Sequence, residues 1–182
     1  ALRAFEEYGD RRGIVQAHLL LSEAFSIRWE SAVAREELGL AEAALLPEFR
    51  YEQALLLQRR AALGCMTNAA PEAVEADLRA ALALFVELGD LQGEASVSDT
   101  LGIIRAQQGD FVSAIQYLER GTNLMRSMGE PDHELGINLA WAYNIVGRFR
   151  EAAAICQRAF QHSGRKKRRA HAGLNLMHAY TC

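Results

Sequence analysis

The stretch Ala81-Leu-Ala-Leu-Phe-Val-Glu-Leu-Gly-Asp90 restates Ala1-Leu-Arg-Ala-Phe-Glu-Glu-Tyr-Gly-Asp10 after 80 residues. A second pair lies near the other end, where Gly136-Ile-Asn-Leu-Ala-Trp-Ala-Tyr143 returns as Gly173-Leu-Asn-Leu-Met-His-Ala-Tyr180 after 37 residues. A period of roughly 20 to 50 residues is typical of solenoids, in which each unit buries its apolar face against its neighbours. The repeats therefore predict a stack of similar units.

The units are predicted to be helical throughout. Apolar residues recur at helical spacing, and no stretch alternates with the period of a strand. Gly9-Asp10, Gly89-Asp90 and Gly109-Asp110 each join a helix stop to a helix start, because glycine adopts the left-handed conformation that ends a helix and aspartate accepts from the first amides of the next. We expect antiparallel helix pairs built from helices at about residues 1–8, 11–27, 30–46, 49–66, 70–88, 91–107, 110–128, 132–146, 149–162 and 167–182.

Residues at fixed positions inside these pairs repeat as well. In one clear unit, Leu101-Gly102 in the first helix is followed by Ala114, Leu118 and Gly121 in the second. A Leu-Gly-like pair and an aromatic residue, followed by small, large and small residues, resemble the pattern of the tetratricopeptide repeat family. The other units carry this pattern at Leu139-Ala140, Tyr143, Ala152, Cys156 and Ala159, at Leu21-Ser22, Phe25, Ala34, Leu38 and Ala41, and, least well, at Ala61-Ala62, Cys65, Val74, Leu78 and Ala81.

This resemblance implies an all-α fold, a right-handed α-solenoid of antiparallel helix pairs. The register positions 21, 61, 101, 139 and 176 lie 37 to 40 residues apart, which is longer than the family's usual repeat of about 34. Such long repeats resemble the arrays of bacterial multidomain regulators, such as MalT-like activators and diguanylate cyclases with tetratricopeptide repeats. We expect one repeat domain over 1–182, a fragment of a longer chain because both ends stop inside a repeat, with repeats at about 11–48, 49–90, 91–130 and 131–164 and half repeats at 1–10 and 165–182.

Charge is distributed unevenly along the chain. Residues 1–90 carry 9 Lys or Arg and 15 Asp or Glu, a net charge of −6, whereas residues 91–182 carry 11 and 8, a net charge of +3. Five of those cations are consecutive, at 165–169. They could attract nucleic acid or an acidic partner, or they form a solvated connection between helices. No aromatic residues alternate with them to stack on bases, which favours the solvated connection and disfavours nucleic acid as a partner.

Cysteine usage and hydropathy favour a cytoplasmic protein. Cys65, Cys156 and Cys182 are odd in number and widely spaced, so they form no disulfide framework. No apolar run approaches the roughly 20 residues that cross a bilayer, and no signal peptide precedes the first helix. We therefore expect no association with a membrane.

The sequence shows no catalytic or cofactor motif. It contains no glycine-rich phosphate loop, no His-Glu-x-x-His and no Gly-x-Ser-x-Gly, so we expect neither enzymatic activity nor a cofactor. His178 and Cys182 are four residues apart on one predicted helix, with His171 near them, and could face a metal ion. The alternative, which we favour, places His178 and Cys182 on the inner face of the last helix, so no metal site is expected.

The best candidate for a binding site is the concave groove that the resemblance implies, lined by the first helix of each pair. At its sixth position stand Asn138 and Asn175, and the register makes Arg60 and Thr100 equivalent to them. Asparagine both donates and accepts, so such a row can hold the backbone of an extended peptide. The alternative is that these asparagines cap or bridge neighbouring helices. The residues expected to flank the row are Arg59, Asp99, Trp141, Asn144 and His178, with Leu63, Ile103, Ile137 and Leu174 as apolar contacts.

These features lead to a function hypothesis. We expect a non-enzymatic scaffold that binds a protein or peptide along its concave face, inside a bacterial signalling or transcription regulator. The alternative is a scaffold for self-association or signal transmission, which forms a homodimer and positions an attached cyclase or DNA-binding domain.

Overall fold

The computed structural model describes residues 2–129 and 133–162, and this part of the chain folds into helices without any strand. Each helix begins and ends within two residues of its predicted bounds, and the tenth predicted helix lies outside the described residues. The helices are α1 (Leu2–Tyr8), α2 (Arg11–Ile27), α3 (Ser31–Ala44), α4 (Arg50–Met66), α5 (Pro71–Leu88), α6 (Leu91–Gln107), α7 (Phe111–Ser127), α8 (His133–Ile145) and α9 (Phe149–His162).

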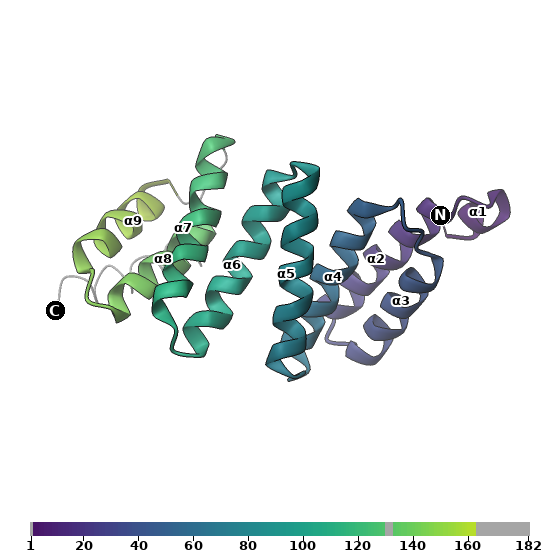
Figure 1. The fold of residues 1–182 in the computed structure, drawn as a ribbon, viewed down its shortest axis with the longest axis horizontal. Coiled ribbons are helices and arrows are strands. Elements are labelled where there is room, and N and C mark those ends of the chain that lie inside the picture. Colours follow the sequence, from purple (N-terminus) through teal and green to yellow (C-terminus); the bar gives the residue numbers. More distant parts are fainter. Residues whose placement is uncertain (1, 130–132, 163–182) are drawn as a thin grey trace. The chain divides into compact units, whose positions relative to one another are not determined.

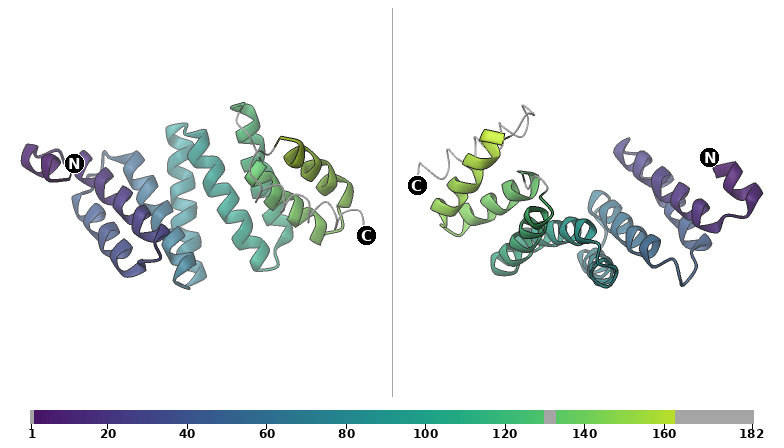
Figure 2. Two further views of the ribbon diagram at one scale, coloured as in Figure 1. Left: turned by 180° about the vertical axis from the view of Figure 1, so that it is seen from behind. Right: turned by 90° about the horizontal axis from the view of Figure 1, so that it is seen from above.

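The helices group into two compact units, one ending at Asp90 and the other beginning at Leu91. In the first unit, α2 packs against α3, α3 and α2 both contact α4, and α4 packs against α5 (Figure 1). In the second unit, α6 packs against α7, α7 contacts α8, and α8 packs against α9; both views of Figure 2 show these neighbours side by side. Each unit thus stacks two helix pairs. The expectation of one continuous domain stays a prediction.

The Gly-Asp pairs form the predicted junctions between helices. Gly9 and Gly109 have φ angles of +67° and +80°, in the left-handed region that favours glycine. The side chain of Asp10 accepts a hydrogen bond of 3.0 Å from the amide of Gly13, and the side chain of Asp110 accepts one of 3.1 Å from Ser113. Each aspartate therefore caps the helix that follows it, as the sequence predicted.

The residues of the repeated pattern form the core that spaces the helices. Ala34, Leu38 and Ala41 of α3 are buried against α2 and α4 in the first unit, and Ala114 and Leu118 of α7 are buried in the second. The alternation of small and large residues lets second helices approach first helices closely. This close approach fixes which side of each first helix stays exposed.

No helix in the described ranges combines the length and the apolar composition that crossing a membrane requires. The prediction of no membrane association rested on the apolar runs along the whole chain.

Candidate functional site

Arg59 on α4 reaches the neighbouring first helix of the same unit. Its Nη1 lies 2.7 Å from Oε1 of Glu23 on α2, and its side chain is about a third exposed. Its Nε is buried without a hydrogen-bond partner. The ion pair therefore ties two first helices together and leaves part of the guanidinium unused.

The ion pair lines a hollow of about 290 Å³ between the carboxyl ends of α2 and α4. We call it the Trp29 hollow, after its largest residue. Its walls are mostly apolar, and besides the ion pair they comprise Ser26, Ile27, Trp29, Ala62 and Met66. Sequence reasoning named Arg59 here but missed Trp29.

Arg60 contacts different helices from its neighbour. Its Nε and Nη2 donate to the two carboxylate oxygens of Asp77 on α5, at 2.7 and 2.8 Å, and its Nη1 lies 3.2 Å from Glu42 on α3. The hydrogen bonds to Asp77 and the charges of both carboxylates raise the pKa of this guanidinium despite partial burial. Both partners lie on second helices, so Arg60 serves the packing of the pair.

The turns after the first helices explain why Arg59 and Arg60 contact different helices. They also correct the predicted register. Trp29, Asn68, Gly109 and Gly147 all have a positive φ angle in the turn after a first helix. Counting back eight residues from each gives 21, 60, 101 and 139, so the register point placed at 61 is wrong by one residue. The turn between α4 and α5 holds four residues, 67–70, where the turns after α2, α6 and α8 hold three. Because of this extra residue, α5 keeps its expected position although the register of α4 is shifted by one residue. The sequence alone therefore did not reveal the shift.

With the corrected register, Arg59 rather than Arg60 is equivalent to Thr100 and Asn138. Arg60 takes the place that leucine occupies at 21, 101 and 139, next to the second helices. The poor match at Ala61-Ala62 becomes an ordinary one, because Ala61 then aligns with Gly102 and Ala140 and is buried like them.

In the second unit the structure brings two predicted residues together. Nδ2 of Asn138 on α8 donates to both carboxylate oxygens of Asp99 on α6, at 3.0 Å each. The hydroxyl of Thr100 donates to the carbonyl of Ser96 in its own helix, at 3.1 Å. On α8, Trp141 is 40% exposed and Asn144 is half-buried. Asn138 thus bridges two first helices and leaves its own carbonyl oxygen to accept from a partner.

Several sequence-based expectations lie outside the described residues. They are the predicted groove positions Asn175 and His178, the apolar contact Leu174, the cluster of His171, His178 and Cys182, and the basic run 165–169.

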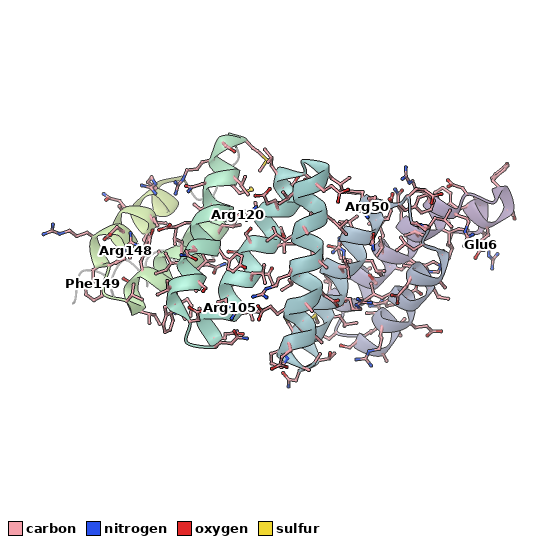
Figure 3. All side chains as sticks on the ribbon, in the orientation of Figure 1. Glu6, Arg50, Arg105, Arg120, Arg148 and Phe149 are labelled. Atoms are coloured by element: carbon pink, nitrogen blue, oxygen red, sulfur yellow. The ribbon has the colours of Figure 1, made fainter. Side chains whose placement is uncertain are left out.

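A second hollow of about 370 Å³, which sequence reasoning missed, lies between α7, α8 and α9. The hydroxyl of Tyr143 donates to Oε1 of Glu119, and the guanidinium of Arg148, labelled in Figure 3, lies 4.0 Å from the centre of the Tyr143 ring. Burial, followed by the hydrogen bond to Glu119, raises the pKa of Tyr143 to about 12. Nη1 of Arg148 is also 3.6 Å from Glu119. The turn after α8 brings Tyr143 and Arg148 together, but only helix packing adds Glu119 of α7, so no local signal marks the hollow.

The chemistry available at these sites is that of hydrogen bonds, ion pairs and apolar contact. Among the described residues, no group of three or more His, Cys, Asp or Glu side chains is arranged to hold a metal ion. Burial raises the pKa of Cys156 to about 11 and also raises that of Cys65, so both thiols are protonated at neutral pH. The arrangement is suited to binding.

No family model matches the sequence, and no curated protein matches it either. Solved structures are similar in fold. A Signal Transduction ATPase with Numerous Domains that has a tetratricopeptide repeat sensor, from Pyrococcus horikoshii, superposes with a TM-score of 0.82 at 16% identity over 99% of this chain. The match spans 29% of that protein's length.

Two shorter structures are similar as well. BtubC from P. vanneervenii matches with a TM-score of 0.70 and 20% identity over 94% of this chain and 78% of its own. A kinesin light chain with nearly identical TPR-like repeats, from Podosopora anserina, matches with a TM-score of 0.72 and 17% identity over 92% of this chain and 85% of its own. These likenesses confirm the expected fold class, an all-α solenoid of tetratricopeptide-like helix pairs.

Proposed function

We propose that this chain is a non-enzymatic scaffold that binds a protein or an extended peptide across its first helices. The tetratricopeptide-like fold suggests a protein-interaction scaffold. The observation that carries the proposal is the pair of polar bridges between first helices, Arg59 with Glu23 and Asn138 with Asp99. Each bridge leaves donors or acceptors that a peptide backbone can use.

The proposed binding residues come from two corresponding places in the two units. Arg59 provides donors in the first unit, and Asn138 provides an acceptor in the second. Trp141, 40% exposed on α8, offers an apolar and aromatic surface one turn from Asn138. The full proposed set is Arg59, Asp99, Thr100, Asn138, Trp141 and Asn144, continued by Asn175 and His178.

We place this scaffold in a bacterial signalling or transcription regulator of the cytoplasm. The long repeats and their resemblance to regulator arrays support this context. The Pyrococcus protein supports the signalling part of this context, because its similar segment is a fraction of a larger signal-transduction ATPase. That likeness also favours a second candidate, a scaffold that self-associates and positions an attached output domain.

The test uses an array of immobilised twelve-residue peptides of random sequence, probed with the labelled chain. We expect a subset of peptides to bind, and we expect the combined Arg59→Ala, Asn138→Ala and Asn144→Ala substitutions to abolish that binding. The control is Val112→Ser, a change at an exposed position of the second helix α7. Binding that survives the triple substitution would show that the first helices are not the site. A stable dimer in light scattering, together with no peptide binding, would favour the second candidate.

A further inference from the structure

Six turns of the described chain close with the same backbone geometry. In each, a residue with positive φ is followed by an amide that donates to the carbonyl five residues earlier, at N–O distances from 2.8 to 3.0 Å. This arrangement requires a left-handed residue, for which glycine is the favoured choice. The donor and acceptor pairs are Asp10 and Phe5, Glu30 and Phe25, Ala69 and Gly64, Asp90 and Phe85, Asp110 and Arg105, and Arg148 and Tyr143.

Trp29 is the exception among the left-handed residues of these turns. Four of the six are glycine and one is Asn68, whereas Trp29 is a bulky residue with a φ of +64°. The 80-residue repeat aligns it with Gly109. The strain is not offset by packing, because the tryptophan is 78% exposed. A residue that is costly for the backbone and unused by the core points to a role at the surface.

The Trp29 hollow supplies that role. Ile27, 73% exposed, and Met66 at the end of α4 line it together with the tryptophan. Its volume of about 290 Å³ lies at the lower end of the range of ligand pockets, so it suits one or two large side chains. On its wall, the side chain of Arg59 is about a third exposed while its Nη1 is held by Glu23 at 2.7 Å.

Charge complementarity indicates which residues flank this apolar side chain in a partner peptide. The first unit carries a net charge of −6. Glu30 in the same turn is already paired with Arg28 at 2.8 Å, whereas Glu36 on α3 and Glu72 in the first turn of α5 are exposed. The exposed ring of Trp29 also attracts cations through its π face. Lysine or arginine beside the anchoring side chain complements this surface.

We propose that the Trp29 hollow receives one large apolar side chain of a partner peptide, flanked by lysine or arginine. This anchor deepens the binding function proposed above and rests on it. The apolar side chain contacts Trp29, Ile27 and Met66, while Arg59 donates to a backbone carbonyl of the peptide.

The probes are mixtures of nine-residue peptides in which the central residue is Leu, Phe or Ser, its two neighbours are Lys or Glu, and other positions are randomised. We expect the Leu and Phe mixtures with Lys neighbours to bind best, and Trp29→Gly to weaken that binding at least tenfold. Trp29→Gly relieves the strained turn, so its melting temperature is expected to equal or exceed that of the original chain. If Trp29→Gly lowers the affinity for peptide without lowering the melting temperature, the loss comes from a missing contact and not from a folding defect.

Fluorescence provides a direct readout of the hollow. The chain has two tryptophans, so the emission of Trp29 is obtained by subtracting the spectrum of the Trp29→Gly variant from that of the original chain, each at saturating peptide. Binding of the Lys-flanked Leu mixture is expected to shift that emission to shorter wavelength. The matched control is Val112→Ser, which removes an apolar side chain that is 73% exposed against 78% for Trp29, and we expect it to leave affinity unchanged.

The outcomes distinguish this anchor from the wider function. If Trp29→Gly leaves affinity unchanged while Asn138→Ala lowers it, the anchor is wrong and the proposed function stands. If the Glu-flanked or Ser-centred mixtures bind as well as the Lys-flanked Leu mixture, the stated partner chemistry is wrong. If no mixture binds, or if neither substitution affects binding, both proposals fail.

Discussion

The two units join neighbouring first helices with different chemistry. Between α2 and α4, the bridge is an ion pair from Arg59 to Glu23, at 2.7 Å. Between α6 and α8, it is an amide that donates twice to a carboxylate, from Asn138 to Asp99. The helices of both units nevertheless pack in the same order. The comparison teaches that the buried small and large residues determine the stack, while the polar bridges between first helices are free to differ.

The units also differ at two corresponding positions of the helix pairs α4–α5 and α6–α7. Where the first unit has Ala61 and Ala81, the second has Gly102 and Gly121. A Cβ atom at Gly102 would lie 2.6 Å from Cγ of Leu118, and one at Gly121 would lie 2.9 Å from the carbonyl oxygen of Ala95. The α6–α7 pair therefore has no room for the alanines that the α4–α5 pair accommodates at these two positions.

The largest effect is expected from the leucine that fills this contact. Leu118 is fully buried, so Leu118→Ala should lower the free energy of unfolding by about 2–5 kcal/mol, measured by urea titration with circular dichroism. Gly102→Ala in the same background should cost less than it does alone, because the removed side chain leaves room for the new methyl group. Additive losses would contradict the close contact between these two residues.

Gly121→Ala tests how closely α7 approaches the backbone of α6. We expect a loss of about 1–3 kcal/mol in the free energy of unfolding, because the carbonyl of Ala95 belongs to a helix and yields little. Gly39→Ala on α3 is the matched control, since a Cβ atom there meets nothing within 4 Å. That control should stabilise the chain by about 0.5–1 kcal/mol, because alanine favours a helix over glycine. The same urea titration measures both variants. Equal changes in the free energy of unfolding for Gly121→Ala and Gly39→Ala would contradict the tight approach at Gly121.

The two bridges should respond differently to salt. Arg59→Ala and Asn138→Ala should each lower stability by up to about 1 kcal/mol. Raising the salt concentration to about 1 M shortens the screening length to about 3 Å, so the effect of Arg59→Ala should shrink, while that of Asn138→Ala changes less. Urea titrations at low and high salt make this comparison. An equal salt response would mean that both bridges depend on long-range charge to the same extent.

The smallest expected effect concerns the cap of α7. The hydroxyl and the amide of Ser113 hold the pKa of Asp110 below its ordinary value of 3.8. Because the folded-state pKa is lowered, the stabilisation is complete above about pH 4 and is lost as the pH falls through the lowered value. Asp110→Asn should therefore lower the melting temperature at pH 7 by more than it does at pH 3. A constant difference across this range would show that the charge of Asp110 does not contribute.

Much of this fold was predictable from local sequence. The Gly-Asp pairs and the spacing of apolar residues located the helices, because each signal acts within a few residues. The register at Ala61 failed for the same reason, since an extra residue in the turn before Pro71 is invisible until the chain is folded. Asn138 and Asp99 were both named, but their contact joins α8 to α6 and depends on packing. Trp29 could have been found by aligning it with Gly109 across the 80-residue repeat.

The closing hydrogen bonds of the turns have one further consequence. Because main-chain atoms alone complete each closure, the side chain at the left-handed position is not needed to hold adjacent helices together. The side chains at positions 29, 68, 109 and 147 can thus be exchanged without loss of the closing hydrogen bond of the turn. A protein of this design could acquire or lose selectivity for a ligand by a single substitution at one of them, with its scaffold left intact.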